Sequence, residues 1–157
     1  MDKTLIERYE SGADALHKVL AGLTDADLDA YPVPGTWSIR EIVLHLMDSD
    51  LIGSYRMKRV IAMDEPTLQP YDETLFNQRL MYRKLNAKQA AEVFRLNRLL
   101  TASMLRLLPE EAFRRTGMHE ETGLHTLTDL IRIYADHLDH HLKFARNKRT
   151  MLGKPMG

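Results

Sequence analysis

Apolar side chains in the first part of the chain recur at steps of three and four residues, which is the period of one face of an α-helix. The positions on this face are Ile6, Tyr9, Ala13, Leu16, Leu20 and Leu23. The pattern predicts a first amphipathic helix over residues 1–24, with its end near Gly22.

Three further segments begin with a polar residue that is followed three positions later by a residue with a carboxylate or amide side chain. Such a pair satisfies backbone N–H groups at the start of a helix. The pairs are Ser38 with Glu41, Asn86 with Gln89, and Thr126 with Asp129. Together with the apolar period that follows each pair, they predict helices over residues 38–62, 86–108 and 126–147.

Each of these three helices carries an apolar stripe, which we expect to face the core. In the second helix the stripe consists of Ile39, Ile42, Val43, Leu46, Ser49 and Gly53. In the third helix it consists of Ala90, Val93, Phe94, Leu100, Met104, Leu107 and Leu108, and it is interrupted by Asn97. In the fourth helix it consists of Leu127, Leu130, Ile131, Tyr134, Leu138, Leu142 and Ala145.

The segments between the helices contain proline, glycine and polar residues and show no alternating strand pattern. Residues 63–71 are predicted to form a loop, residues 72–84 a short helix, and residues 110–125 a turn of helix followed by a loop. We therefore expect an all-α fold, a four-helix bundle with a short extra helix between the second and third helices. We expect a single domain over residues 1–157.

The amino-acid composition excludes several kinds of site and disfavours one kind of partner. The absence of cysteine excludes disulfides, thiolate nucleophiles and cysteine-based zinc sites. Because 22 basic residues balance 22 acidic ones, the net charge does not favour nucleic acid as a partner. The charged N-terminus and the lack of a long apolar run predict neither a signal peptide nor a membrane span, and hence a soluble cytoplasmic protein.

Candidate chemistry lies among the seven histidines. His137 and His141 fall within the apolar stripe of the last helix and are four residues apart, a spacing that lets two imidazoles converge on one ion. His45, at the edge of the inner face of the second helix, could supply a third ligand. Three neutral imidazoles bind a divalent ion such as zinc or nickel and leave coordination positions open. The structural alternative is that these histidines only form hydrogen bonds.

Other polar residues are candidates for positions around the ion, and each also has a purely structural interpretation. Glu41 lies one turn before His45 and could orient it, but its capping position already accounts for it. Asn97 is either a polar residue that specifies the bundle or a group in a pocket. His119 and His125, in the loop before the last helix, are either surface residues or general bases that overhang the site.

Several residues outside the inward stripes are expected to have ordinary roles. We expect Asp136, Asp139 and His140 to be solvated, and His17 to lie at the surface, although it is a further candidate base for a hydrolase. Trp37 is expected to pack against the start of the second helix.

Two stretches of the chain resemble a known family. Residues 37–46, with the sequence WSIREIVLHL, and residues 136–141, with the sequence DHLDHH, are similar to the two histidine motifs of the DinB/YfiT-like superfamily. The resemblance implies a four-helix bundle, often a homodimer, in which His45, His137 and His141 hold one divalent metal ion, usually nickel or zinc. The motifs match at every ligand position.

The resemblance leaves the reaction open. Members of the superfamily include enzymes that depend on a low-molecular-weight thiol, among them mycothiol-dependent isomerases and bacillithiol transferases, as well as proteins named as metal-dependent hydrolases. We expect a metal-dependent enzyme with a small-molecule substrate, either a hydrolase or a transferase with a low-molecular-weight thiol cosubstrate. The alternative from another class is a non-catalytic, metal-binding or metal-free, stress-related dimeric bundle that acts through a protein partner.

Overall fold

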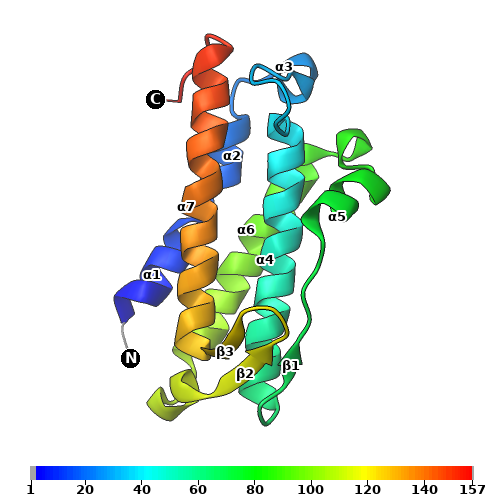
Figure 1. The fold of residues 1–157 in the computed structure, drawn as a ribbon. Coiled ribbons are helices and arrows are strands. Elements are labelled where there is room, and N and C mark those ends of the chain that lie inside the picture. Colours follow the sequence, from blue (N-terminus) through cyan, green and yellow to red (C-terminus); the bar gives the residue numbers. More distant parts are fainter. Residues whose placement is uncertain (1–2, 157) are drawn as a thin grey trace.

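Four long helical segments pack side by side and form a bundle, as Figure 1 shows. The structure is a computed structural model and describes residues 3–156. The segments are α1 (Lys3–Ser11) continued by α2 (Ala15–Leu20), then α4 (Ile39–Ala62), α6 (Ala87–Arg106) and α7 (Leu127–Met151). The helices α4 and α6 run in the same direction, because the connection between them returns along the length of the bundle (Figure 1). The expected all-α, four-helix architecture is confirmed.

The first segment is broken, contrary to the prediction of one helix over residues 1–24; residues 1 and 2 lie outside the described part. The chain turns at residues 12–14 between α1 and α2. At Gly12 it passes so close to the bundle that a Cβ atom would lie 2.5 Å from Cδ2 of Leu138 and 2.8 Å from a guanidinium nitrogen of Arg98. This close approach requires glycine, which weakens a helix. A further short helix, α3 (Asp25–Asp29), is capped by Thr24 and was not predicted.

The later helices begin where their capping residues predict. Ser38 and Thr126 each accept a hydrogen bond from the backbone N–H three positions ahead and complete a capping box, while the Asn86 side chain accepts hydrogen bonds from two backbone N–H groups. The ends of these helices are predicted less well than their starts. The helix α6 stops at Arg106, and α7 continues one turn beyond the predicted end at residue 147, to Met151.

The connection between α4 and α6 contains the predicted short helix in two pieces. These are α5 (Glu73–Arg79), which Asp72 caps, and the 3₁₀ helix η1 (Tyr82–Lys84). Met81 separates them with a positive φ of 55°, a conformation that an α-helix cannot continue through. A second 3₁₀ helix, η2 (Glu110–Arg114), follows α6 and corresponds to the predicted turn of helix.

A small three-stranded sheet closes one end of the bundle, so the expectation of no strands was wrong (Figure 1). Its strands are β1 (Thr67–Leu68), β2 (Thr116–His119) and β3 (Gly123–Thr126). The strand β2 pairs in parallel with β1 and in antiparallel with β3. Strands of two to four residues are too short to show an alternating pattern. Their pairing depends on the close packing of helices that brings residue 67 beside residue 118.

The predicted stripes of the second and fourth helices are buried, and so is that of the first except for the partly buried Leu23. The stripe of the third helix was only partly right, because Ala90 and Phe94 are buried but other members are not. Val93, Leu100 and Leu107 are 43%, 71% and 86% exposed. The face that meets the core instead carries Ala87, Ala90, Ala91, Phe94, Arg98, Thr101, Ala102 and Leu105. Within residues 3–156, no helix combines the length and apolar character needed to cross a membrane.

The orientation of α6 follows from a polar cluster in the middle of the bundle. Arg98 is 2% exposed and donates a hydrogen bond of 2.9 Å to the carboxylate of Asp50 on α4. Its terminal nitrogens donate to the backbone carbonyls of Tyr9 and Tyr134. Asn97 also donates to Asp50, at 2.7 Å. A buried charge requires such partners, so the cluster turns this face of α6 inward. Asn97 is therefore part of the bundle's polar core.

Candidate metal centre

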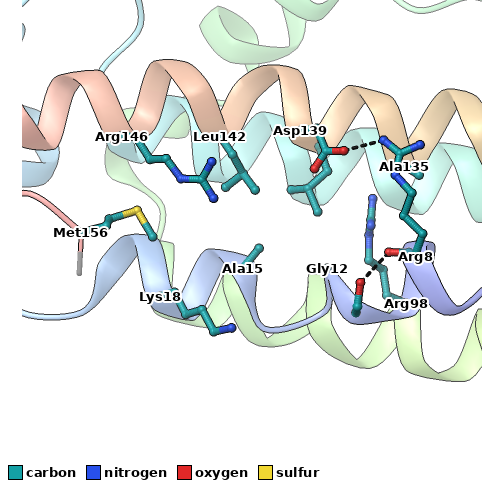
Figure 2. A pocket seen from close by; sticks show the side chains of 12 residues that line it. Arg8, Gly12, Ala15, Lys18, Arg98, Ala135, Asp139, Leu142, Arg146 and Met156 are labelled. Atoms are coloured by element: carbon teal, nitrogen blue, oxygen red, sulfur yellow. Dashed lines mark hydrogen bonds and ion pairs between the residues drawn. The ribbon is translucent and has the colours of Figure 1, made fainter.

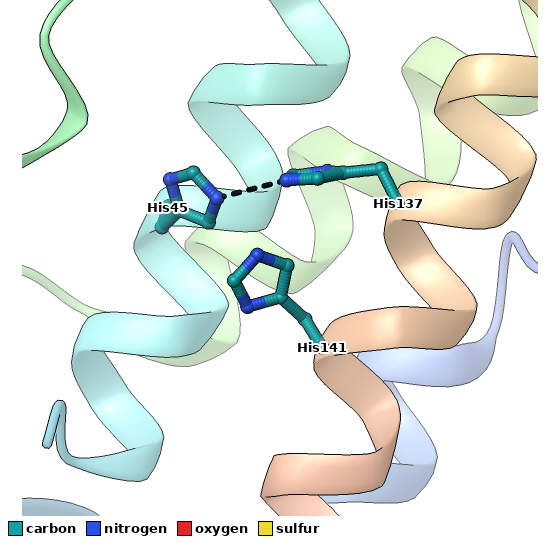
Figure 3. A group of neighbouring side chains, drawn as sticks. All are labelled: His45, His137 and His141. Carbon is teal, nitrogen blue, oxygen red and sulfur yellow. Dashed lines mark hydrogen bonds between the residues drawn. The ribbon is translucent and has the colours of Figure 1, made fainter.

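Three histidines from two helices meet between α4 and α7. Figure 3 shows His137 and His141, one turn apart on α7, directed toward His45 on α4. His45 was expected at the edge of its helix, but the structure buries it completely, with 0% exposure. Trp37 covers it from the start of α4, with ring centroids 4.9 Å apart, and α7 covers it from the other side. His137 and His141 are partly buried.

The spacing of the three imidazoles suits a single ion. One nitrogen from each ring can be chosen so that all three lie within 4.8 Å of one another. The Nε2 atoms of His45 and His137 are 3.1 Å apart. Two nitrogen ligands at about 2.0–2.1 Å from the same ion are separated by roughly 3.0–3.4 Å in tetrahedral or octahedral geometry. The nitrogens of His45 and His137 are therefore already as far apart as two ligands of one ion, and a nitrogen of His141 lies within 4.8 Å of both side chains' donor atoms.

All three rings are neutral at physiological pH. Burial, followed by the neighbouring imidazoles, lowers the pKa of His45 and of His137 to about 3. Burial and the neighbouring His140 lower the pKa of His141 to about 4. A neutral imidazole keeps the lone pair that a metal needs. The donor set therefore fits a borderline divalent ion such as zinc or nickel.

Packing orients the His45 ring more than hydrogen bonding does. Among the described residues, its Nδ1 atom is buried and has no hydrogen-bond partner. The ring lies instead between the indole of Trp37 and the imidazole of His141, whose centroid is 4.6 Å away. The Nδ1 atom of His137 faces the hydroxyl of Ser49 at 3.4 Å. These contacts leave Nε2 of His45 and Nε2 of His137 turned toward each other.

A carboxylate that the sequence did not single out completes the group. Glu73, the first residue of α5, places Oε2 at 3.6 Å from Nε2 of His45. Its side chain is 53% exposed, so the carboxylate contacts both the histidines and solvent. No motif marks Glu73, because its position depends on the path of the connection from α4 to α6. The only local signal is Asp72, which predicts that a helix starts here.

A pocket of about 440 Å³ opens beside the three histidines. His141, Glu73 and Trp37 are among the residues that line it. The rings of Trp37 and His141 are nearly parallel, with an interplanar angle of 9° and centroids 6.3 Å apart. Trp37 packs at the start of α4, as expected, and in addition forms a wall of the site. Of the three histidines, only His141 lines this pocket, so a small molecule in it would contact the His141 imidazole and the Glu73 carboxylate together.

The remaining candidates lie elsewhere. Glu41 accepts hydrogen bonds from the backbone N–H of Ser38 and from the hydroxyl of Tyr31, so its capping role holds and it does not orient His45. His119 and His125 stand on β2 and β3 with ring centroids 6.3 Å apart. Both form their hydrogen bonds within this hairpin and not with the three-histidine group.

The outer histidines and acids have partners at the surface. His17 contacts Glu92 at 3.0 Å, and both side chains are substantially exposed. Asp136 and Asp139 pair with Arg8, and His140 is exposed beside Phe144. None of these residues belongs to the three-histidine group, although the His140 ring lies 5.2 Å from that of His141.

A second cavity, of about 320 Å³, lies between α1, α2 and another face of α7 (Figure 2). None of the three clustered histidines lines it. Four cations line it, and two of them are paired, Arg8 with Asp139 and Arg98 with Asp50. The candidate metal ligands are therefore at the other pocket, which His141 lines.

The fold and the site together define a helical bundle with a three-histidine centre that opens into a pocket. Comparison with known families names this class: the sequence profile of the DinB superfamily matches residues 8–145. The chain belongs to the DinB superfamily, as its two histidine motifs predict.

Named relatives cover nearly the whole chain. A Bacillus subtilis protein named "Putative metal-dependent hydrolase YfiT" is 26% identical over 97% of this chain and 84% of its own length. A relative from Oceanobacillus iheyensis, also named "Putative metal-dependent hydrolase", is 30% identical over 87% of this chain and 79% of its own length.

Two solved structures share the fold. The structure of YfiT from Bacillus subtilis superposes with a TM-score of 0.89 at 24% identity and covers 96% of this chain and 86% of that one. The structure of a mycothiol-dependent maleylpyruvate isomerase superposes with a TM-score of 0.71 at 11% identity, over 89% of this chain and 58% of that one.

Proposed function

We propose that the protein is a metal-dependent hydrolase of small molecules that holds one divalent ion, zinc or nickel, through His45, His137 and His141. The observation that carries the proposal is the position of Glu73, whose carboxylate lies 3.6 Å from Nε2 of His45 beside an open pocket. When bound, such an ion supplies Lewis acidity, which polarises a substrate carbonyl and lowers the pKa of water.

The residues of the chain supply the rest of the chemistry. Three neutral nitrogens leave the full charge of the ion in place and leave room for substrate, as in catalytic zinc sites. The Glu73 carboxylate takes the proton of the attacking water and returns it to the leaving group. Trp37 forms an apolar wall that holds the substrate and limits the access of bulk water.

The names of the relatives support the hydrolase over the thiol transferase, and Glu73 favours it on chemical grounds. Water is a weak nucleophile near neutral pH and needs a base, whereas a thiol, with a pKa near 8.5, is already partly ionised. The transferase and the non-catalytic bundle are distinct outcomes of the test that follows.

The test begins with metal content. Untagged protein is purified without added metal and measured by plasma mass spectrometry, beside the double variant His137→Ala, His141→Ala. The control is His17→Ala, His125→Ala, which removes the same number of histidines outside the cluster. We expect about one zinc or nickel per chain in the wild type and in the control, and almost none in the cluster variant. The loaded proteins are then assayed with activated esters and amides.

The alternatives give different results. Conjugation of a low-molecular-weight thiol to an electrophile, without hydrolysis, would replace the hydrolase by the transferase. Equal metal content in all three proteins, or unchanged thermal stability after zinc is added, would favour the non-catalytic bundle. The homodimer, the cytoplasmic location and the lack of a nucleic-acid partner stay predictions; sedimentation equilibrium measures the first of them.

A further inference from the structure

The histidine pocket extends along α7, away from the three imidazoles. His141 lies at one end of its lining and Lys148 at the other, seven residues further along the helix. At 1.5 Å per residue and 3.6 residues per turn, the two residues share a face of α7 and are separated by about 10 Å along the axis. The pocket therefore has two chemically different ends.

Lys148 is an unusual residue to find in such a lining. It is 2% exposed, although lysine is almost never buried without a partner. Its Nζ atom donates a hydrogen bond to the hydroxyl of Thr36, which in turn donates to the carbonyl of Val33. An ammonium group has three N–H bonds, and Thr36 takes one of them. The others have no carboxylate within salt-bridge distance among the described residues.

The nearby charges leave the ammonium group only partly compensated. Burial lowers the pKa of Lys148, and the charge of Glu41 raises it in part. Glu41 already accepts hydrogen bonds from the backbone of Ser38 and from Tyr31. A buried cation without an ion-pair partner is costly, and an anion that enters the pocket would remove this cost.

The walls between the two ends are aromatic and apolar. Trp37 and Ile42, from the start of α4, and Phe144, about one turn after His141 on α7, are part of the lining. The Phe144 ring is 47% exposed, with its centroid 6.1 Å from that of His141. Asn147 adds an amide close to Lys148 in the lining. Apolar walls with a few polar groups at fixed points are typical of small-molecule sites.

We propose that this pocket selects small molecules with an apolar or aromatic body and a terminal carboxylate, with the carboxylate on Lys148 and the other end at His141 and Glu73. The inference deepens the proposed hydrolase and rests on it for the identity of the reacting end. One lysine suits a monoanion, whereas phosphate groups are usually held by several donors. Glu73 lines the same pocket and would repel a more highly charged ligand.

The chain carries its own reporter for this test, because Trp37 is its one tryptophan and forms part of the pocket. We would titrate 5-phenylpentanoate and 5-phenylpentan-1-ol, which have the same length and differ in charge, and follow tryptophan fluorescence. Both zinc-loaded and metal-free protein are used, so that binding of the carboxylate to the ion is separated from binding to Lys148. Zinc is chosen because it has no redox or d-electron chemistry.

In the wild type, we expect the carboxylate to bind about tenfold tighter than the alcohol, in both forms of the protein. Lys148→Met should remove this preference and retain binding of the alcohol, which shows that the pocket is still folded. Lys148→Arg should keep the preference. Lys143→Met, the same substitution at an exposed position of α7, should change neither affinity.

Equal affinity for the two ligands in the wild type, or no fluorescence response to either, would overturn the inference. So would a preference that persists in Lys148→Met. Metal content separates this result from the hydrolase proposal. If the wild type binds no metal but prefers the carboxylate, the hydrolase fails and the pocket assignment stands. If it binds metal and hydrolyses esters without preferring the carboxylate, the pocket assignment fails and the hydrolase proposal stands.

Discussion

The carboxylate of Glu73 lies 3.6 Å from Nε2 of His45, although the two residues belong to different helices and the sequence does not connect them by any motif. Glu73 opens the short helix α5, in the connection that returns along the bundle beside α4. The contact places an acid–base group next to an otherwise neutral cluster. It is the feature on which the proposed hydrolase rests.

Replacing Glu73 by glutamine tests its role. Glu73→Gln preserves the shape of the side chain and removes its ability to take up a proton. We expect zinc content to be unchanged and kcat for an activated ester to fall by about 10²–10⁴-fold, the usual contribution of a general base. Glu111→Gln, at an exposed position, is the control. If Glu73→Gln loses zinc as well, Glu73 is a metal ligand and not the base.

Breaking the central ion pair should be costly. Arg98 and Asp50 have side chains that are each 2% exposed, and they lie 2.9 Å apart. Arg98→Met leaves the Asp50 charge buried, so we expect the free energy of unfolding to fall by about 3–5 kcal/mol in a denaturant titration. Arg132→Met, which breaks an exposed pair with Asp129, should cost less than about 1 kcal/mol. Similar losses for both variants would contradict the role of Arg98.

Gly53 on α4 leaves space for a neighbouring ring. A Cβ atom there would lie 2.6 Å from ring atoms of Tyr134, which is 5% exposed. Alanine normally favours a helix over glycine by about 1 kcal/mol. We nevertheless expect Gly53→Ala to destabilise the protein by about 1–3 kcal/mol, because the ring must shift within a packed core.

A double-mutant cycle with Tyr134→Leu checks the cause of this loss. When the ring is absent, Gly53→Ala should be neutral or stabilising. An equal loss in both backgrounds would show that the clash with Tyr134 is not the reason.

The hairpin at the end of the bundle should respond to pH through His119. Burial lowers the pKa of His119 below its ordinary value, and its Nδ1 atom accepts hydrogen bonds from the backbone N–H groups of Glu121 and Thr122. These two hydrogen bonds therefore require a neutral His119 ring. As the pH falls below about 6.5, His119 takes up a proton in the unfolded state before it does so in the folded state. Its contribution to the free energy of unfolding is therefore complete above this pH and is lost as the pH falls further.

The contribution of His119 can be isolated by comparison with His119→Gln. The difference in the free energy of unfolding between wild type and variant should shrink between pH 7.5 and 5, by up to about 1.4 kcal/mol per pH unit. His125→Gln provides the control in the same hairpin. A difference that stays constant with pH would show that His119 does not titrate in this way.

Much of the helical framework could be predicted because its causes are local. Ser38 and Thr126 start their helices through hydrogen bonds to backbone groups three positions away, and such contacts can be read from the chain. The four-residue spacing of His137 and His141 likewise follows from the helical period alone. The ligand pair on α7 and the starts of the long helices were therefore accessible before the fold was known.

Other features could not be predicted because they depend on contacts between distant segments. The inward face of α6 is set by Arg98, whose burial is tolerated only because Asp50 lies opposite it. An apolar stripe through Leu100 is equally periodic in the sequence, but the Leu100 side chain is 71% exposed. The break at Gly12 and the three-stranded sheet have the same origin, since each arises where two elements approach closely.

The amino-acid sequence by itself determined the helical class, the helix starts and the one-turn spacing of two histidines, since each depends on hydrogen bonds and periodicity within a few residues. Only the tertiary structure decided that His45 is fully buried against them, that Glu73 faces His45 and that Lys148 ends the same pocket. These positions are set by how the helices pack, and packing depends on the whole chain at once.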